Sequence, residues 1–247
     1  MVEKKYLCSW SGGKDSTASI ILAHLHNEPL DTILFSEVMY DKRRNISGEN
    51  PRHINFIINK AKPLFESWGY EVKILRAERD YLDCFNRIIE KPRKHPDHKN
   101  KKFGFALTGL CGIKRDCKLK PIKDFCQNIK EPIVQYVGIC SDEPIRLKSL
   151  HKSDNNVSLL EKYNYTEQMA KELCIEYDLL SPCYELSNRG GCFFCPNAKI
   201  EEHREIKKLY PEVWNEFVAL EDEDNVANSK WSIYHGTLKE RDEKLSC

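Results

Sequence analysis

Two groups of residues in this sequence have the types and spacing needed for chemistry. Near the start, residues 11–16 read SGGKDS and combine two glycines with a lysine, an aspartate and two serine hydroxyls. Further on, Cys183, Cys192 and Cys195 form a C-x8-C-x2-C pattern within SPCYELSNRGGCFFCPNAK. The first group suits a phosphate, and the second suits a bound metal or sulfur chemistry.

The first group lies where a strand is expected to meet a helix. Residues 4–10 are apolar and strand-like, and residues 15–27 have helical spacing, so the glycines fall in the turn between them. Such a turn offers backbone N–H groups and the positive end of the helix dipole to a phosphate. The Walker A pattern fails because Cys8 stands at its first glycine and Asp15 follows the lysine, and G-x-G-x-x-G fails as well. A phosphate loop is predicted, and a plain tight turn is the alternative.

Further strands and helices alternate along the chain. Strands are expected at 31–41, 70–78 and 131–140, and helices at 50–69 and 117–130. This alternation predicts an α/β fold with a doubly wound, Rossmann-like parallel sheet. Polar residues 141–156 are expected to be loop. Residues 165–179 are expected to be a helix capped by Thr166, and residues 201–225 to be helical.

Length and composition narrow the class of protein. With 247 residues we expect a nucleotide-binding domain at 1–150 and a helical, cysteine-rich region at 151–247 packed on it. The net charge of +1 provides no global basic field, so any contact with nucleic acid must come from local patches. No apolar run approaches the ~20 residues that span a bilayer, and the start lacks a secretory h-region. A cytoplasmic protein without membrane contact is therefore expected.

Cysteine is unusually frequent, with eleven residues in the chain. Disulfides are rare in a reducing compartment, so clustered cysteines indicate metal ligands or sulfur chemistry. A fourth ligand for the C-x8-C-x2-C group is expected from Cys117 or Cys111, and His203 is an alternative that would complete a zinc site. Five other cysteines are expected to be core residues: Cys8, Cys84, Cys126, Cys140 and Cys174.

The SGGKDS stretch resembles the pyrophosphatase loop, or PP-loop, of the adenine-nucleotide alpha hydrolase superfamily. Three further stretches are similar to segments of its phosphoadenosine phosphosulfate reductase-like family: SGENPRHINFI at 47–57, CKLKPI at 117–122 and GICSDEPIRL at 138–147. The resemblance implies cleavage of ATP between the α and β phosphates, which leaves an adenylylated substrate and pyrophosphate.

The same resemblance implies a set of site residues. Lys14, Asp15 and Ser16 are the expected catalytic residues, and Asp15 is expected to help place Mg2+. The residues expected to bind ATP are Ser9, Ser11, Gly12, Gly13, Lys14, Asp15, Ser16, Ser36, Gly138 and Arg146.

The cysteine pattern resembles the sulfur-transfer enzymes of DNA phosphorothioation, which place one cysteine before a KLKP-like segment and then C-x8-C-x2-C. This implies a four-iron four-sulfur cluster, with structural Zn2+ as the alternative. The implied ligands are Cys117, Cys183, Cys192 and Cys195, with Cys111 as the alternative to Cys117. Assimilatory adenylylsulfate reductases instead use an adjacent Cys-Cys pair and a cysteine near the end of the chain. Cys111 and Cys117 are not adjacent, and the terminal Cys247 stands alone.

Together these features predict an ATP pyrophosphatase that adenylylates an acceptor and transfers sulfur to it with help from the cluster. The basic stretch KPRKHPDHKNKKFG at 91–104, expected to be loop, favours DNA or RNA as the acceptor, and a solvated loop is its alternative reading. A cysteine desulfurase is the expected sulfur donor. The sequence leaves open whether the protein forms an oligomer. Two other functions remain: a sulfonucleotide reductase, and a non-catalytic ATP-binding subunit with a structural zinc.

Overall fold

The computed structural model describes residues 3–106, 111–187 and 190–246, so Cys247 lies outside it. The chain forms two compact units that are interleaved in sequence. The first contains residues 1–36, 52–75 and 121–190, and the second contains residues 37–51, 76–120 and 191–247. The expected division into a nucleotide-binding domain at 1–150 and a cysteine-rich region at 151–247 stays a prediction. Within the described ranges, no helix has the length and apolar character needed to cross a bilayer.

The first unit is built on a five-stranded sheet. Its strands, in spatial order, are β5 (Glu71–Arg76), β2 (Thr32–Glu37), β1 (Lys5–Trp10), β7 (Ile133–Val137) and β8 (Asn156–Val157). Strand β1 pairs in parallel with β2 and with β7, and β7 pairs in parallel with β8. This confirms the predicted α/β fold with a parallel sheet. It also brings the carboxyl ends of β1 and β7 side by side, where a doubly wound sheet binds its ligand.

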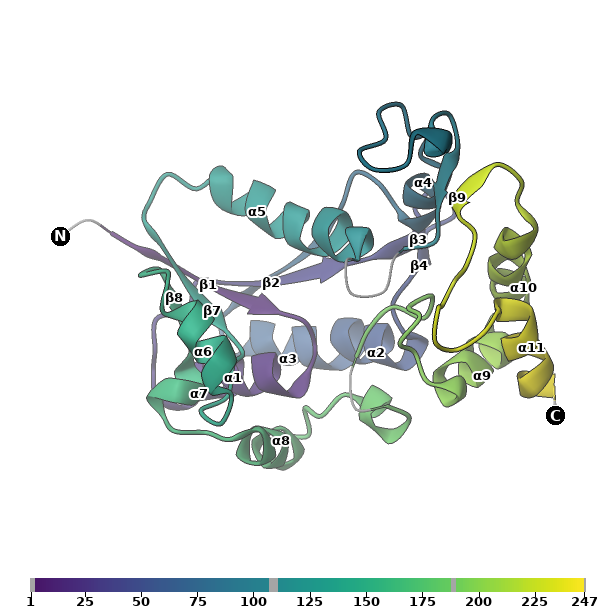
Figure 1. Ribbon diagram of the computed structural model, residues 1–247. Coiled ribbons are helices and arrows are strands. Elements are labelled where there is room, and N and C mark those ends of the chain that lie inside the picture. The colour runs from purple at the N-terminus through teal and green to yellow at the C-terminus, as the bar shows by residue number, and fades with distance from the viewer. Residues whose placement is uncertain (1–2, 107–110, 188–189, 247) are drawn as a thin grey trace. The chain divides into compact units, whose positions relative to one another are not determined.

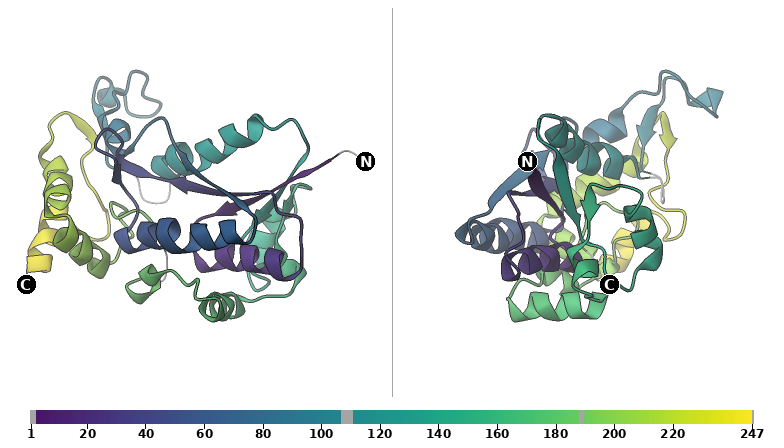
Figure 2. Two further views of the ribbon diagram at one scale, coloured as in Figure 1. Left: turned by 180° about the vertical axis from the view of Figure 1, so that it is seen from behind. Right: turned by 90° about the vertical axis from the view of Figure 1, so that its left-hand side faces the viewer.

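Helices cover both faces of this sheet (Figures 1 and 2). Helix α5 lies over one face, and α1 and α3 lie along the other. Helix α1 is buried over eight consecutive positions, from Ser16 to Ala23, because it packs against the sheet and against α7 and α8. The helices of this unit are α1 (Lys14–Leu25), α2 (Pro51–Phe56), η1 (Ile57–Ala61), α3 (Lys62–Ser67), α5 (Lys120–Gln127), α6 (Pro144–Leu150), α7 (Leu159–Lys162), α8 (Glu167–Glu176) and η4 (Pro182–Glu185).

Several expected elements differ in detail. The prediction that residues 141–156 are loop was wrong, because α6 forms there with Pro144 in its first turn and buries Leu147 and Leu150. The single helix expected at 50–69 contains the π-helical turn η1 in its middle. Thr166 caps α8 as predicted, since its hydroxyl accepts a hydrogen bond from the amide of Met169 at 3.3 Å.

The second unit combines short strands with helices. Strand β3 (Met39–Asp41) pairs antiparallel with β4 (Ile46–Ser47), so the strand expected at 31–41 is divided between the two units. Strand β6 (Lys102–Gly104) pairs in parallel with β9 (Val226–Asn228). The helical stretch expected at 201–225 breaks at a proline, as proline cannot continue a helix from its interior. The helices here are α4 (Tyr81–Asn86), η2 (Pro96–His98), η3 (Lys114–Leu119), α9 (Ile200–Leu209), α10 (Pro211–Ala219), η5 (Leu220–Asp222) and α11 (Leu238–Ser246).

An aromatic core holds the second unit together. Phe193 and Phe194, which lie between Cys192 and Cys195, are both buried. The ring of Phe194 stacks on that of Tyr81 with 4.0 Å between centroids, and Phe193 packs edge-on against Phe217 at 5.8 Å. The two phenylalanines therefore anchor the cysteine segment in the core, where aromatic pairs stabilise beyond their buried area.

His203 supports the same segment from α9. Its Nε2 donates to the carbonyl of Phe193 at 2.8 Å, and its Nδ1 accepts from Nε of Arg241 at 3.1 Å. Both ring nitrogens are thus engaged in hydrogen bonds, and the alternative that His203 completes a zinc site stays a prediction. Burial, together with the Arg241 charge, lowers the pKa of His203 to about 3, so its imidazole is neutral in the folded protein.

This buried histidine predicts a loss of stability in acid. In the unfolded chain His203 takes up a proton below its ordinary pKa of about 6.5, whereas the folded state resists protonation down to about 3. The free energy of unfolding should therefore fall as the pH drops from 6.5 towards 3, by about 1.4 kcal/mol per pH unit from this residue. Urea unfolding of the wild type at pH 7 and pH 5 measures the loss.

The variant His203→Gln should flatten this dependence, because glutamine keeps a donor for the Phe193 carbonyl but does not titrate. His151→Gln, which changes an exposed histidine, is the matched control and should leave the slope as in the wild type. If the free energy of unfolding fell equally steeply with pH in His203→Gln and in the wild type, His203 would not be the source of the acid sensitivity.

Candidate functional site

The SGGKDS loop lies at the carboxyl end of β1 and leads directly into α1. Gly12 has a φ of +72°, and a Cβ on it would lie 2.6 Å from Cε1 of His53, so both its backbone and its surroundings require glycine. Ser16 Oγ accepts from the amide of Ser11 at 3.1 Å and donates to the carbonyl of Gly13 at the same distance. These bonds curl the loop over the first turn of α1, at the strand-to-helix turn that the sequence predicts, and its binding of phosphate stays a prediction.

One backbone amide of the loop is already held by an oxygen from elsewhere in the chain. The amide of Lys14 donates to the hydroxyl of Tyr184 at 3.0 Å. This is one of the first N–H groups of α1, which have no partner inside the helix. A hydroxyl oxygen at this point marks a position that a phosphate oxygen would also satisfy. Sequence reasoning missed Tyr184, since it lies 170 residues away.

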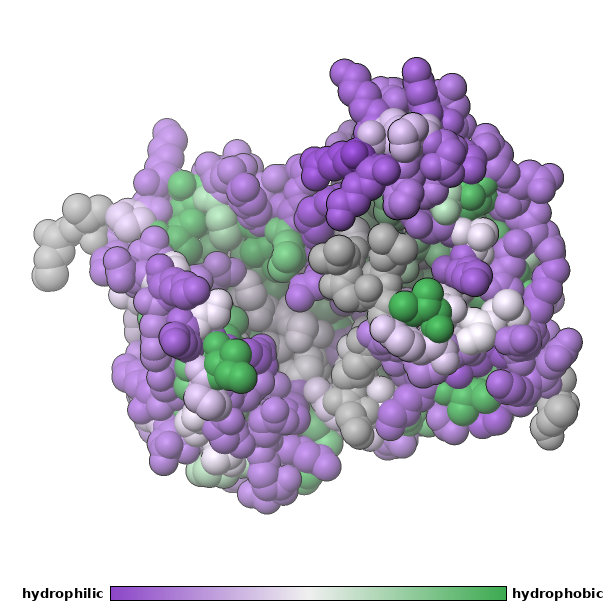
Figure 3. Space-filling view, in the orientation of Figure 1, coloured by the Kyte–Doolittle hydropathy of each residue, from purple (hydrophilic) through white to green (hydrophobic). Residues whose placement is uncertain are grey.

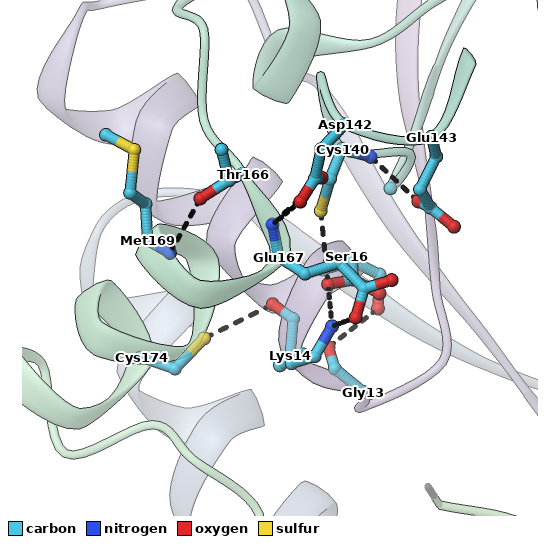
Figure 4. A network of polar contacts seen from close by, with 12 residues as sticks. Gly13, Lys14, Ser16, Cys140, Asp142, Glu143, Thr166, Glu167, Met169 and Cys174 are labelled. Atoms are coloured by element: carbon cyan, nitrogen blue, oxygen red, sulfur yellow. Dashed lines mark hydrogen bonds and ion pairs between the residues drawn. The ribbon is translucent and has the colours of Figure 1, made fainter. Parts of the chain in front are cut away.

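The Lys14 ammonium forms ion pairs with two carboxylates (Figure 4). Its Nζ lies 2.6 Å from Asp15 and 3.0 Å from Glu167, which begins α8. Burial works against the charge, but the hydrogen bonds to these two carboxylates raise the pKa of Lys14, so the ammonium stays charged. Glu167 in turn is oriented by its amide, which donates to Asp142 at 3.1 Å. Glu167 is a site residue that the sequence did not indicate.

The segment after β7 closes against the start of α1. A Cβ on Gly138 would lie 2.5 Å from the backbone nitrogen of Ser16, so only glycine allows this approach. Cys140 Sγ donates to Asp15 at 3.3 Å, and the amide of Cys140 donates to Glu143 at 2.9 Å (Figure 4). Arg146 pairs with Glu143 and donates to the carbonyl of Gly138 at 3.4 Å. The predicted residues Gly138 and Arg146 thus lie in one network with the loop.

Two other residues predicted to bind ATP, Ser9 and Ser36, have different surroundings. Ser9 lies within β1, where its hydroxyl accepts a hydrogen bond from the side chain of Gln135 on β7. Ser36 is buried in β2. Their contact with ATP stays a prediction.

Cys183 belongs to the first unit and lies in a buried polar group close to the loop. Its sulfur accepts from the hydroxyl of Ser181 at 3.2 Å and lies 3.6 Å from Nδ1 of His53. The other ring nitrogen, Nε2, donates to the carbonyl of Ser11 at 2.9 Å. Because a carbonyl only accepts, Nε2 carries a proton, and His53 connects the phosphate loop to the first cysteine of the pattern.

Cys192 and Cys195 belong to the second unit, where they follow a short antiparallel pairing. Phe193 donates its amide to the carbonyl of Gly48 at 2.9 Å, and Asn50 donates to the carbonyl of Gly191 at 3.1 Å. A Cβ on Gly48 would lie 2.5 Å from the ring of Phe194. The SGEN stretch noted in the sequence therefore forms the backbone support of the cysteine segment.

A buried carboxylate lies beside this segment. Glu49 is paired with Cys192 across the antiparallel bridge, and its Oε1 lies 2.9 Å from Nζ of Lys118. Its Oε2 has no hydrogen-bond partner among the described residues, although the side chain is almost fully buried. Burial raises the pKa of the Cys192 thiol, with Lys118 opposing the shift. An unpartnered buried oxygen is rare in folded proteins, and a further polar or metal-bound group would satisfy it.

The candidates for the fourth ligand lie in the second unit as well. Cys111 is exposed and accepts from the amide of Lys114 at 3.4 Å. Cys117 is buried in η3, and its Sγ lies 3.9 Å from Sγ of Cys84 on α4. The hydrogen bond between these two thiols lowers the pKa of Cys84 and, with burial, raises that of Cys117. The prediction that Cys84 is a plain core residue overlooked this contact.

Since Cys183 lies in the first unit and the other candidates lie in the second, the four-cysteine site stays a prediction. A different group in the second unit does bring its ligand atoms within 4.8 Å of one another, namely His95, Asp97 and His98 on the basic loop. Two of these three side chains are exposed.

Comparisons with known proteins give distant similarities. No family model matches the chain. Two uncharacterized proteins of Methanocaldococcus jannaschii are similar to it: MJ0066 is 20% identical over 87% of this chain and 41% of its own length, and MJ0973 is 22% identical over 90% and 50%. The chain thus spans half or less of the curated relatives it matches. Among solved structures, the U34-tRNA thiolase NcsA of Methanococcus maripaludis with its 4Fe-4S cluster aligns over 99% of this chain and 72% of its own, with 15% identity and a TM-score of 0.43.

The Lys14 network predicts a specific loss of nucleotide affinity. The variant Lys14→Met removes the ammonium that attracts phosphate from this network, while Asp15 and Glu167 are left to repel it. Because a hydrogen bond to a charged group contributes about 1.5–3 kcal/mol, binding of Mg-ATP should weaken about tenfold or more. Isothermal titration calorimetry measures the change.

The control is Lys171→Met, which removes the same charge from an exposed position on α8. It should bind Mg-ATP as the wild type does. Unchanged affinity in Lys14→Met would show that this loop does not hold the phosphates.

Proposed function

We propose that this chain is an ATP-dependent sulfur-transfer enzyme of the PP-loop kind that acts on nucleic acid. The observation that carries the proposal is the curled SGGKDS loop at the carboxyl end of β1, with the charged Lys14 and the Tyr184 hydroxyl that accepts from the Lys14 amide. The cysteine segment, supported by its own backbone pairing, supplies the second half of the argument.

The loop would bind the phosphates of ATP that leave as pyrophosphate. Backbone amides at the start of α1 and the helix dipole stabilise the negative charge of the phosphates. The Lys14 ammonium would strengthen this stabilisation as pyrophosphate leaves. Asp15 would turn from Lys14 to Mg2+, which prefers carboxylate oxygens and substrate phosphates. The Tyr184 hydroxyl would exchange its contact with the Lys14 amide for a phosphate oxygen.

The segment after β7 would border the α phosphate. Arg146, half exposed and tied to the Gly138 carbonyl, can reach a phosphate without leaving its backbone contact. An oxygen of the acceptor would attack the α phosphorus, so that the acceptor becomes adenylylated and pyrophosphate leaves. Adenylylation turns that oxygen into part of a good leaving group, AMP, which a sulfur nucleophile can displace.

The cysteines fit a thiophilic cofactor. Cys183, Cys192 and Cys195, with Cys117 or Cys111, would hold a four-iron four-sulfur cluster, and the unpartnered oxygen of Glu49 lies next to Cys192. Such a cluster, when bound, supplies or positions sulfide and electrons. The chain's part is to orient the thiolates: Ser181 donates to the sulfur of Cys183, and the paired backbone at Gly48 and Asn50 holds Cys192. Zinc is the alternative for the same ligands.

The acceptor is proposed to be nucleic acid because of the basic loop at 91–101. Arg93, Lys94 and Lys99 are exposed there, and the segment presents a hydrophilic surface (Figures 1 and 3). Such side chains bind phosphates of a nucleic-acid backbone without reading its sequence. A cysteine desulfurase is the proposed source of sulfur.

The metal content of protein purified without oxygen tests the cofactor. We expect about four irons and four acid-labile sulfides per chain, as this cluster type requires. The iron should be lost in Cys183→Ser, Cys192→Ser and Cys195→Ser, and kept in Cys126→Ser, a partly buried cysteine of α5 used as the control. If the protein contained one zinc per chain and no sulfide, the metal would be structural, and the sulfur-transfer part of the proposal would be wrong.

Pyrophosphate exchange tests the acceptor. ATP–pyrophosphate exchange should depend on added RNA or DNA, and its apparent nucleic-acid affinity should drop in the triple variant Arg93→Ala, Lys94→Ala, Lys99→Ala. The slope of log affinity against log salt should also become shallower, by about 0.7–0.9 for each phosphate that the variant no longer neutralises. The control removes three exposed lysines of the first unit: Lys148→Ala, Lys152→Ala, Lys171→Ala.

Exchange that a small molecule triggers and nucleic acid does not would rule out this acceptor. Sulfite release from phosphoadenosine phosphosulfate would identify a sulfonucleotide reductase instead. ATP binding without exchange, whatever the partner, would indicate a non-catalytic subunit.

A further inference from the structure

The second unit has a surface pocket that the proposed chemistry leaves unused. Its volume is about 590 Å³, and residues between Glu221 and Glu240 line it. Ligand pockets measure about 300–1,000 Å³, so this one accommodates a group the size of a nucleotide. The residues that line it include no cysteine, so a ligand would be held here rather than given sulfur.

The loop at 229–237 gives the pocket a defined shape. Trp231 is buried, and its Nε1 donates to the carbonyl of Phe194 at 3.0 Å. The Ser232 hydroxyl accepts from the amides of Tyr234 and His235, at 3.2 and 3.1 Å. Serine hydroxyls commonly close turns in this way. The backbone that carries Tyr234 is thus fixed before any ligand binds, which lowers the entropy cost of binding.

The ring of Tyr234 belongs to the pocket lining and remains in solvent. Tyr234 is 72% exposed, and its neighbour Ile233 is 68% exposed. Within the described part of the chain, no other ring packs on that of Tyr234. A free aromatic face on a fixed turn is the kind of platform on which an unpaired base stacks.

The charged groups of the lining favour a phosphate at Lys230. Both oxygens of Glu221 accept backbone amides at the start of α11, at 2.7 and 3.1 Å, and Glu240 accepts the amide of Thr237 at 3.0 Å. These carboxylates are therefore already engaged. Lys230 is exposed and forms no ion pair with any described residue, so its ammonium is available to an anion.

The pocket is linked to the basic loop at 91–101 through the β6–β9 pair. The basic loop leads into β6, and β9 leads into the pocket loop. Where they meet, Lys102 donates its amide to the carbonyl of Asn225 at 2.8 Å, and the Asn225 side chain donates to the carbonyl of Asn100 at 3.0 Å. The three residues of β9 span about 10 Å, so one short strand of nucleic acid can contact both surfaces.

We propose that this pocket binds one unpaired nucleotide of the acceptor, with its base on the ring of Tyr234 and a phosphate at Lys230. The inference rests on the proposed function, in which the acceptor is nucleic acid, and it adds a site that selects single-stranded over paired regions. In a duplex both faces of a base are covered by its neighbours, whereas an unpaired base offers a face for stacking. RNA and DNA share this chemistry, because every base has such a face.

Fluorescence anisotropy tests the pocket with an end-labelled, mixed-sequence strand of about 12 nucleotides, a length that single-strand sites cover. The strand is used as RNA and as DNA, alone and annealed to its complement. Tyr234→Ala should weaken binding of the single strands about fivefold or more and leave binding of the duplexes unchanged. Tyr234→Phe, which keeps the ring, should bind as the wild type does. The control Tyr210→Ala, which removes another exposed tyrosine of the second unit, should do the same.

Salt dependence tests the phosphate contact. In Lys230→Ala the slope of log affinity against log salt should become shallower by about 0.7 for single strands. Lys208→Ala removes an exposed lysine of α9 and should keep the slope of the wild type. A larger loss on RNA than on DNA in Tyr234→Ala would support the site and identify RNA as the acceptor.

Two results would overturn the inference. One is equal single-strand affinity in Tyr234→Ala and Tyr210→Ala, which would leave the pocket to a partner protein. The other is equal weakening of single strands and duplexes by Tyr234→Ala, because the ring would then not contact an unpaired base. Neither result would touch the proposed acceptor if ATP–pyrophosphate exchange in the wild type depends on nucleic acid. Exchange that does not respond to nucleic acid would instead contradict the proposed acceptor, whatever the Tyr234 variants show.

Discussion

The ring of His53 is the point on which the first unit's site depends. The side chain is buried, and its two nitrogens lie 2.9 Å from the carbonyl oxygen of Ser11 and 2.8 Å from the hydroxyl oxygen of Ser181. A Cβ on Gly12 or on Gly190 would lie within 3 Å of the ring, so both backbones pass against it. One side chain therefore sets the shape of the phosphate loop and the position of the segment that leads to Cys183.

The ion pairs of Lys14 in the first unit would have to rearrange for the loop to bind a phosphate as proposed. Lys14, Asp15 and Glu167 neutralise one another in part, which lets an ammonium persist at a mostly buried position. The same carboxylates would repel a phosphate unless a cation joined them. This is a physical reason to expect Mg2+ together with the nucleotide, since the ion would take Asp15 and release Lys14 to the phosphates.

In the second unit, aromatic packing rather than contact among the cysteines fixes the backbone of the cysteine segment. Phe193 and Phe194 are held by the core and by the hydrogen bonds that their carbonyls accept from His203 and Trp231, at 2.8 and 3.0 Å. The core and these hydrogen bonds thus fix the backbone around Cys192, and Glu49, whose Oε2 has no partner among the described residues, is paired with Cys192 across the bridge. Such preorganisation lowers the entropy cost of binding a cofactor.

The sequence by itself determined the parallel α/β fold and the glycine turn between β1 and α1, because both follow from local patterns: apolar periodicity, and glycines between a strand and a helix. The family resemblance named Gly138 as a residue of the ATP site, and in the structure a Cβ on it would lie 2.5 Å from the backbone nitrogen of Ser16. It missed α6, whose two buried leucines lie in a polar stretch. Only the tertiary structure brought Tyr184 to the loop amide, Glu167 to Lys14 and Cys84 to Cys117. These partners are separated by 170, 153 and 33 residues, and no local pattern encodes a contact that depends on how the chain packs.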